Sequence, residues 1–258
     1  RAELGTHIVF KTGNRIVKLF SPFWKEQYAV EVACLKNLTD LPVPQIDQVG
    51  KIEGWPYMIV SVVEGVPTRA VWNQLTANQK ASVMVELGEF MRRLHDHPSI
   101  ASLPSDWSSF LNERVRNLSQ HHGLSGDWKR WALNHVRPLS TRSQRTVVLN
   151  CDLTSDHIFL VERAGSWRLS AVIDFGDAMM GPSYYEFTAP LLDHAFGDGA
   201  LAAALMNGYG ELLTEEVKQE LTRYFLIHQY WRLDEMPDDL LEQPPEDFAA
   251  IVWGECAT

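Results

Sequence analysis

Three side chains that can carry out acid–base and metal chemistry are grouped in one part of the chain. Asp152 comes shortly after the apolar residues 147–149, His157 lies five positions later, and Asp174 follows a second apolar run. Two carboxylates and an imidazole suit phosphoryl transfer, because that reaction needs a positioned hydroxyl group and a divalent metal ion held against nucleotide phosphates. We therefore treat these residues as candidate catalytic and metal-binding groups.

The flanking sequence predicts how these side chains come together. Residues 158–161 read as a strand, a Gly165-Ser166 turn follows, and a second strand ends at Asp174. This arrangement places the candidate groups at one end of a small hairpin. The alternative is an ordinary hairpin with a polar turn, and the upstream residues described below argue against it.

The spacing matches a kinase-type catalytic loop, in which an Asp is followed five positions later by a metal-binding residue and, after a hairpin, by the Asp of a DFG motif. Asp152, His157 and Asp174 occupy those three places. The sequence here resembles the aminoglycoside phosphotransferase family, small-molecule kinases with the protein-kinase fold whose usual loop reads H-G-D-L-H-P-G-N-I. It is most similar to the 2''-phosphotransferase branch, whose loops resemble D-x-x-x-x-H-I-L followed by I-D-F-G-D.

Two positions depart from the usual family loop. Asn150 stands where the family has His, and His157 stands where it has the metal-binding Asn. A neutral imidazole can bind a metal ion, although Mg²⁺ prefers oxygen ligands. The resemblance implies that Asp152 accepts or orients the proton of the acceptor hydroxyl and that His157 and Asp174 bind the metal. It also implies Mg²⁺ as cofactor and ATP or GTP as co-substrate.

An upstream lysine and glutamate extend the resemblance. Residues 6–10 and 15–20 read as two strands, and Lys18 lies on the second, where the family's Lys contacts the α- and β-phosphates. Apolar residues then recur at helical spacing over residues 24–38. Glu31 sits where the family's helix carries the carboxylate that pairs with that Lys. Taken alone, each residue has a simpler alternative, as a surface Lys on a strand or a solvated Glu on a helix.

A second pair of strands leads to the expected nucleotide hinge. Residues 48–52 and 56–63 read as strands that follow a stiff linker with two prolines. The resemblance implies that backbone groups of Ser61, Val62 and Val63 hydrogen-bond the purine edge. Because side chains do not read the base there, the sequence leaves the choice between ATP and GTP open.

The remainder of the chain reads as mainly helical. Thr76 and Gln79 have the form of a capping box in front of a helix whose core stripe runs through residues 83–94. Further helical patterns cover residues 107–136, residues 199–209, residues 215–232 with Thr214 as N-cap, and residues 248–252.

Several other residues capable of chemistry have a structural interpretation. His95 reads as a hydrogen-bonded structural residue, Glu186 as a carboxylate that binds backbone below the active site, and Cys151 as a small packing residue rather than a nucleophile. His121 and its neighbour His122 lack a third metal ligand. The acidic stretch 234–247 reads as a solvated loop; the alternative is that its carboxylates bind the ammonium groups of an acceptor.

Composition narrows the class of protein. With 258 residues, 45% hydrophobic content and nine Trp, the chain can bury a large core. We expect a cytoplasmic protein without membrane contacts, because there is no membrane-length apolar run or signal peptide and the three cysteines lack disulfide spacing. The net charge of −10 argues against nucleic acid and favours a cationic ligand. Arg1 in place of an initial Met indicates a trimmed chain, a processed product or a domain of a longer protein, which could lack the first strand and phosphate loop.

Together these features predict an α+β, bilobal, protein-kinase-like fold. A small antiparallel sheet would form a nucleotide-binding lobe over residues 1–63, and residues 64–258 would form a mainly helical lobe. We expect a monomeric or dimeric phosphotransferase that moves the γ-phosphate of ATP or GTP to a hydroxyl of a small cationic molecule such as an aminoglycoside. The alternatives are a kinase of another small alcohol or sugar, and a degenerate kinase-like binding domain without turnover.

Overall fold

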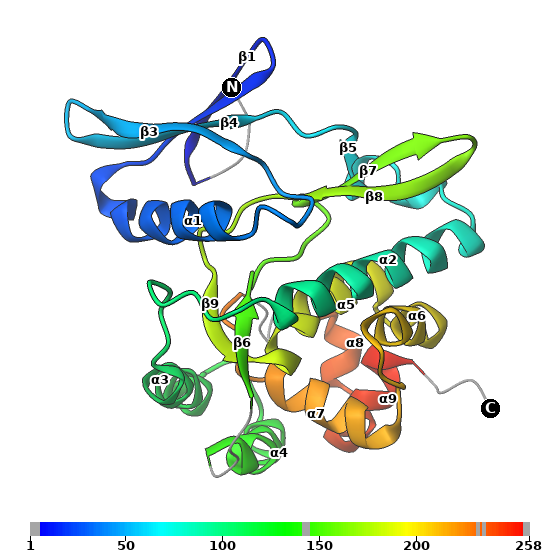
Figure 1. Ribbon diagram of the computed structural model, residues 1–258. Helices are drawn as coiled ribbons and strands as arrows, with labels where there is room; N and C mark the ends of the chain where they lie inside the picture. Colours follow the sequence, from blue (N-terminus) through cyan, green and yellow to red (C-terminus); the bar gives the residue numbers. More distant parts are fainter. Residues whose placement is uncertain (1–5, 141–144, 231–232, 234–235, 255–258) are drawn as a thin grey trace.

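The computed structural model describes residues 6–140, 145–230, 233 and 236–254, and it consists of a smaller β-rich lobe above a larger helical lobe (Figure 1). The expected α+β, bilobal, kinase-like architecture is confirmed. In this described part, no helix is both long and apolar enough to cross a membrane. The expectations for residues 1–5 and for residues 234 and 235 lie outside the described residues.

The smaller lobe is a four-stranded antiparallel sheet covered on one face by a helix. Its strands β1 (Ile8–Thr12), β2 (Arg15–Leu19), β3 (Ile46–Ile52) and β4 (Trp55–Ser61) are arranged in the order β1-β2-β4-β3. Alternate residues of β4 are buried, as expected for a strand with one face on a core. Helix α1 (Lys25–Asn37) lies beneath this sheet, between it and the larger lobe (Figure 1).

The larger lobe is built around a close contact between two helices, α2 (Ala77–Asp96) and α6 (Gly199–Tyr209). The predicted capping box at the start of α2 is confirmed, and the predicted apolar stripe of this helix is buried. Gly88 and Gly208 form the crossing point, because a Cβ on either residue would overlap backbone atoms of the opposite helix. The absence of side chains at both positions lets the two backbones approach directly.

Two small antiparallel pairings carry the candidate catalytic residues. Strand β6 (Thr146–Leu149) pairs with β9 (Met179–Pro182). Strands β5 (Val66–Pro67), β7 (Ile158–Arg163) and β8 (Ser166–Val172) form a three-stranded sheet, in which β7 and β8 are the expected hairpin. The predicted turn at Gly165-Ser166 is wrong by one residue: Ala164 and Gly165 take the positive φ values of 50° and 77°, and Ser166 already pairs with Arg163.

One predicted helix ends early. The N-cap Thr214 is confirmed, but α7 (Glu215–Phe225) does not continue to residue 232. Arg114 provides a physical reason, because its guanidinium donates hydrogen bonds to the carbonyls of Ile227 and His228, at 3.1 and 2.8 Å. These carbonyls are therefore turned towards α3 instead of a next helical turn. The remaining helices are α3 (Trp107–Gln120), α4 (Gly126–Val136), α5 (Thr188–Ala195), α8 (Asp238–Leu241) and α9 (Phe248–Trp253).

Candidate active site

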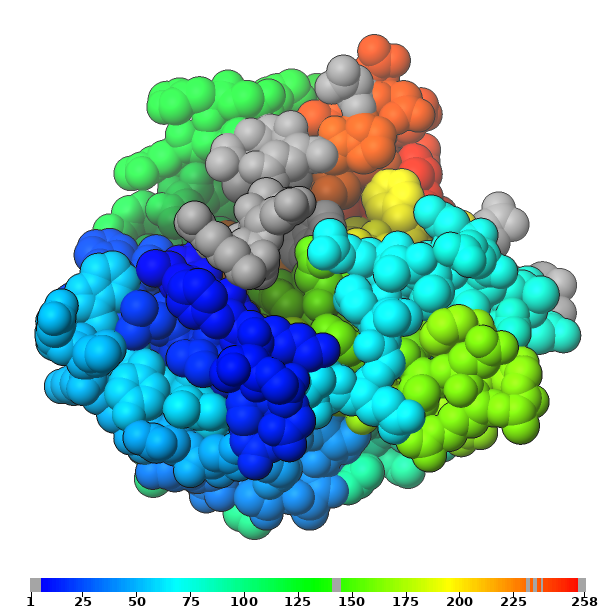
Figure 2. Space-filling model, turned by 90° about the horizontal axis from the view of Figure 1, so that it is seen from above, coloured from blue at the N-terminus to red at the C-terminus, as the bar shows by residue number. Residues whose placement is uncertain are grey.

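The catalytic loop begins where β6 ends and lies between the two lobes. Seen from above, the molecule is hollowed between the N-terminal strands and the segments of the larger lobe (Figure 2). Asp152 has a side chain that is 25% exposed. Its backbone N–H donates to Asn150 Oδ1 over 3.0 Å, which fixes the turn that presents the carboxylate.

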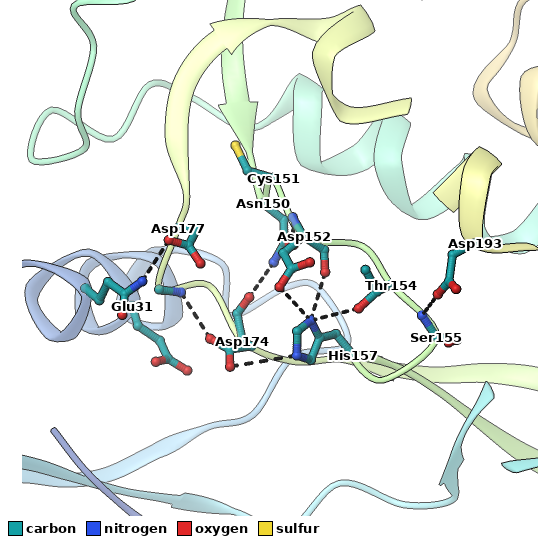
Figure 3. A network of polar contacts seen from close by, with 12 residues as sticks. Glu31, Asn150, Cys151, Asp152, Thr154, Ser155, His157, Asp174, Asp177 and Asp193 are labelled. Atoms are coloured by element: carbon teal, nitrogen blue, oxygen red, sulfur yellow. Dashed lines mark hydrogen bonds and ion pairs between the residues drawn. The ribbon is translucent and has the colours of Figure 1, made fainter. Parts of the chain in front are cut away.

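His157 lies between the two candidate carboxylates (Figure 3). Its Nδ1 is 2.9 Å from the carbonyl oxygen of Asp152 and 3.2 Å from the carboxylate Oδ2 of the same residue. Its Nε2 faces Asp174 Oδ2 at 3.9 Å. Burial lowers the pKa of His157, but the hydrogen bond that its Nδ1–H donates to Asp152 and the charge of Asp174 outweigh burial and raise this pKa to about 9. The structure therefore brings together the three residues singled out by their spacing.

The donor atoms around Asp174 fit a magnesium ion bound together with nucleotide phosphates. His157 Nε2 and Asp174 Oδ2 face each other across a gap that a small cation could bridge. Within the described residues, no cluster of three or more His, Cys, Asp or Glu side chains forms a complete metal site. Mg²⁺ commonly takes one or two protein ligands and fills its other positions with phosphate oxygens and water. Binding would displace the proton from His157, since a ligating imidazole must be neutral.

Asn150 joins the catalytic loop to the segment that carries Asp174. Its side-chain Nδ2 donates to the carbonyl of Asp174 over 2.8 Å, while its Oδ1 accepts from the backbone of Asp152. The residue is fully buried. The Asn150 side chain therefore stands where the family has His, and both its NH₂ group and its carbonyl oxygen form hydrogen bonds. Below it, the buried carboxylate of Glu186 accepts from the backbone N–H groups of Asn150 and Cys151 at 2.6 and 3.0 Å, which confirms the structural role predicted for Glu186.

Cys151 is buried and has a positive φ of 71°. The expected packing role is therefore only part of the reason for a small residue, because this backbone conformation also favours glycine, which the usual family loop has there. Burial, followed by the nearby carboxylates, raises the pKa of the thiol well above its ordinary value. A protonated, enclosed thiol is a poor nucleophile, in agreement with the sequence interpretation.

Lys18 and Glu31 form the ion pair expected between β2 and α1. Lys18 Nζ lies 2.8 Å from Glu31 Oε2 and 3.0 Å from Asp174 Oδ1, and the side chains of Lys18 and Glu31 are almost fully buried. Burial lowers the pKa of Lys18, but the two carboxylates outweigh it and leave this pKa above its ordinary value. For Asp174, burial raises the pKa, but the positive charges of Lys18 and His157 outweigh burial and leave this pKa below its ordinary value. The lysine is therefore a fixed positive charge beside the candidate metal ligand.

A cavity of about 340 Å³ between the lobes connects this charged cluster with the hinge. Lys18, Glu31 and Asp174 line one end of it, and Ser61 to Val63 line the other. Its walls are mostly apolar, with contributions from Val9, Ile16, Met58, Val60, Phe159 and Ile173. Such a slot suits a flat, largely apolar ring with polar edges.

The hinge residues differ in the availability of their backbone groups. The N–H of Ser61 donates to the carbonyl of Gln45 over 2.9 Å, and the N–H of Val62 donates to the carbonyl of Asn14 over 3.2 Å. Of the three hinge residues, only Val63 has an amide without a backbone partner in the described part of the chain. This distinction depends on strand pairing, which the sequence alone does not reveal.

Other residues considered from the sequence have structural or solvent-facing positions. His95 is buried, and its Nδ1 is 2.9 Å from the hydroxyl of Tyr209, which confirms a structural role. In the acidic stretch, Glu242, Glu246 and Asp247 are exposed. This exposure supports the interpretation of a solvated surface for these three residues.

Sequence reasoning missed two polar residues at the site, Gln27 and Asp177. Gln27 Nε2 donates to Asp177 Oδ1 over 2.8 Å, so α1 contacts the segment after Asp174 directly. Gln27 and Glu31 are four residues apart on one helix face, and this spacing could have indicated that Gln27 also faces the site.

The chain was compared with known families and solved structures. The model of a family described as the phosphotransferase enzyme family matches residues 7–221. The GDP complex of wild-type aminoglycoside 2'-phosphotransferase-IIIa is similar with a TM-score of 0.72 and 18% identity, over 97% of this chain and 85% of the other. The GDP and kanamycin complex of APH(2")-IIIa has a TM-score of 0.67 and 17% identity, over 96% and 89%. The streptomycin–ATP–APH(2")-IIa ternary complex has a TM-score of 0.58 and 16% identity, over 96% and 94%.

At these identities the solved structures establish the likeness in fold, and the family match extends over most of the chain. This match confirms the family resemblance inferred from the catalytic loop and the DFG segment. The chain belongs to the phosphotransferase enzyme family.

Proposed function

We propose that this protein transfers the γ-phosphoryl group of ATP or GTP to a hydroxyl of a small cationic molecule of the aminoglycoside class. One observation carries the proposal: Lys18, His157 and Asp174 converge beside Asp152 at the end of a cavity between the lobes. A binding domain without turnover has no need for this combination of a proton acceptor, metal ligands and a fixed cation.

Each residue has a distinct part in the reaction. Asp152 takes the proton of the acceptor hydroxyl while the oxygen of that hydroxyl bonds to the γ-phosphorus. The bond between this phosphorus and the β–γ bridging oxygen breaks to leave ADP or GDP. Lys18, oriented by Glu31, holds the α- and β-phosphates. His157 and Asp174 would hold Mg²⁺, which neutralises developing charge on the phosphates when bound.

The nucleotide would occupy the cavity that ends at the hinge. Its purine ring would lie between the apolar walls, with the amide of Val63 at the ring edge and the phosphates at Lys18. Residues 1–63 would then be the nucleotide-binding lobe and residues 64–258 the catalytic and acceptor lobe. Structures with similar folds were solved with GDP and with ATP, so both nucleotides belong in the first assay.

Charge supports a cationic acceptor. Asp152 and Asp177 add negative charge near Asp174, and the protein has a net charge of −10. Similar structures were solved with kanamycin and with streptomycin. The free buried thiols of Cys34 and Cys151 support a cytoplasmic setting, where thiols stay reduced.

The test is a coupled assay of ADP or GDP release with kanamycin as acceptor, on the wild-type protein and on Asp152→Asn. We expect Asp152→Asn to lower kcat by about 10²-fold to 10⁴-fold and to leave the Kd of Mg²⁺–nucleotide unchanged, because only the proton acceptor is lost. Asp156→Asn is a matched control, since this exposed carboxylate in the same loop pairs with Arg69 away from the cluster. Equal turnover in the wild type and Asp152→Asn would contradict the assignment, and turnover only with uncharged sugars or alcohols would change the acceptor class.

A further inference from the structure

Helix α1 carries two polar side chains on one face, and one of them contacts the larger lobe. Glu31 binds Lys18, and Gln27, one helical turn earlier, donates from Nε2 to Asp177 Oδ1 over 2.8 Å. An added Cβ on Gly176 would lie 3.5 Å from the Cβ of Gln27. The helix therefore packs directly on the segment that follows Asp174.

Asp177 lies between two parts of the chain that are far apart in sequence. It accepts a hydrogen bond from Gln27. Burial raises the pKa of its carboxyl group, and the nearby side chain of Tyr230, beyond the end of α7, opposes that effect. The hydrogen bond from Gln27 thus joins the small lobe to the segment after Asp174.

The carboxylate of Asp177 has no part in the proposed metal binding or proton transfer. Asp174 and His157 supply the proposed metal ligands, and Asp152 is the proposed proton acceptor. Figure 3 shows Asp177 directed towards α1, while His157 lies between Asp152 and Asp174. The contacts of Asp177 therefore indicate that it positions other residues.

We propose that Gln27 and Asp177 form a positioning pair that holds α1 in the orientation in which Glu31 aligns Lys18 with the nucleotide phosphates. The proposal rests on the proposed phosphotransferase function. Because Gln27 and Glu31 are on the same helix face, a rotation or shift of α1 that breaks the first contact also displaces the second. A displacement of Lys18 by about 1 Å is enough to weaken catalysis strongly.

The test first replaces Gln27, the hydrogen-bond donor of the pair, with an acceptor. A second substitution, at Asp177, then restores the hydrogen bond with donor and acceptor exchanged. In Gln27→Glu the amide donor is lost and two carboxylates face each other, which weakens the contact between α1 and this segment. In the double variant Gln27→Glu/Asp177→Asn, the new amide donates to the new carboxylate. The single variant Asp177→Asn keeps a neutral hydrogen bond to Gln27 by rotation of either amide.

We expect Gln27→Glu to lower kcat/KM for the Mg²⁺–nucleotide by about tenfold or more, as for the loss of a hydrogen bond to a charged group. Asp177→Asn should lose less than about threefold, and the double variant should return to the level of Asp177→Asn. Glu26→Gln, on the exposed side of the same helix turn, is the control and should match the wild type. Urea unfolding of each variant separates this effect from a change in stability.

Nucleotide affinity is measured in parallel by thermal shift with Mg²⁺–ATP and Mg²⁺–GTP, without acceptor. The inference is overturned if the wild type and Gln27→Glu have equal affinity and equal kcat/KM, or if the double variant is as impaired as Gln27→Glu. A wild-type protein that binds neither nucleotide would overturn the proposed function together with this inference. The two failures are therefore distinguishable.

Discussion

Asn150 uses both ends of its side-chain amide to hold the catalytic loop against the segment of Asp174. We expect Asn150→Leu, which is similar in size, to leave two buried backbone groups unpaired and to lower the free energy of unfolding by about 2 kcal/mol. Because Asp152 would lose its fixed position, kcat should fall by about 100-fold. Urea unfolding and the coupled assay measure the two effects, with the exposed Asn37→Leu as control. Unchanged kcat would show that this link does not position Asp152.

His157 makes the stability of the metal-free protein depend on pH. Its folded-state pKa of about 9 lies above the ordinary 6.5, so its stabilising contribution is fully present below pH 6.5 and is lost as the pH rises through 9. The side chain is 21% exposed, and the shift corresponds to at most about 3 kcal/mol. The difference in unfolding free energy between the wild type and His157→Asn, measured in EDTA, should therefore shrink from pH 6 to pH 9.5.

A matched control for this titration is His122→Asn, which replaces an exposed histidine outside the cluster. Its difference from the wild type should stay nearly constant over the same pH range. A constant difference for His157→Asn as well would show that the imidazole is not held between Asp152 and Asp174 in solution.

At the scale of elements, the contact between α2 and α6 depends on two glycines. The Cβ of Gly88→Ala would overlap the carbonyl of Leu205 and lie 2.6 Å from the backbone nitrogen of Tyr209, and backbone atoms cannot rotate away. We expect this variant to lower the free energy of unfolding by about 2 to 3 kcal/mol, because the helices must separate. Gly126→Ala is the control: nothing lies within 4 Å of its added Cβ, so it should be neutral or slightly stabilising. Equal denaturation midpoints for the two variants would refute the close crossing.

At the scale of the whole molecule, charge should govern the encounter with the acceptor. The net charge of −10 and the carboxylates at the site attract a polyamine at low ionic strength, and salt screens this attraction. We expect KM for kanamycin to rise several-fold between about 50 mM and 500 mM KCl, since the Debye length shortens from roughly 14 Å to 4 Å. KM for the anionic nucleotide should not rise in parallel. A salt-independent KM for the acceptor would argue for an uncharged substrate.

Much of this molecule could be predicted from local sequence. The spacing of Asp152, His157 and Asp174 led to the family, which the family match confirms, and the capping box, the α2 stripe and the N-cap Thr214 are confirmed in the structure. Such features depend on residues close together in the chain, where helical and strand periodicity decide which side chains share a face. The ion pair of Lys18 and Glu31 was predictable through the family resemblance.

Other features were decided by tertiary structure alone, because they depend on which distant backbone groups meet. The carbonyl of Asn14 accepts from the amide of Val62, whereas the amide of Val63 has no backbone partner among the described residues, and Arg114 ends α7 by turning two carbonyls towards itself. Gln27 finds Asp177 across 150 residues of chain. Local periodicity shows which side chains share a helix face, but it does not show which distant donor meets which acceptor, since each such hydrogen bond requires the packed lobes to bring a donor within about 3 Å of its acceptor. The sequence by itself therefore determined the class of chemistry, and the fold determined which groups are left available to perform and position it.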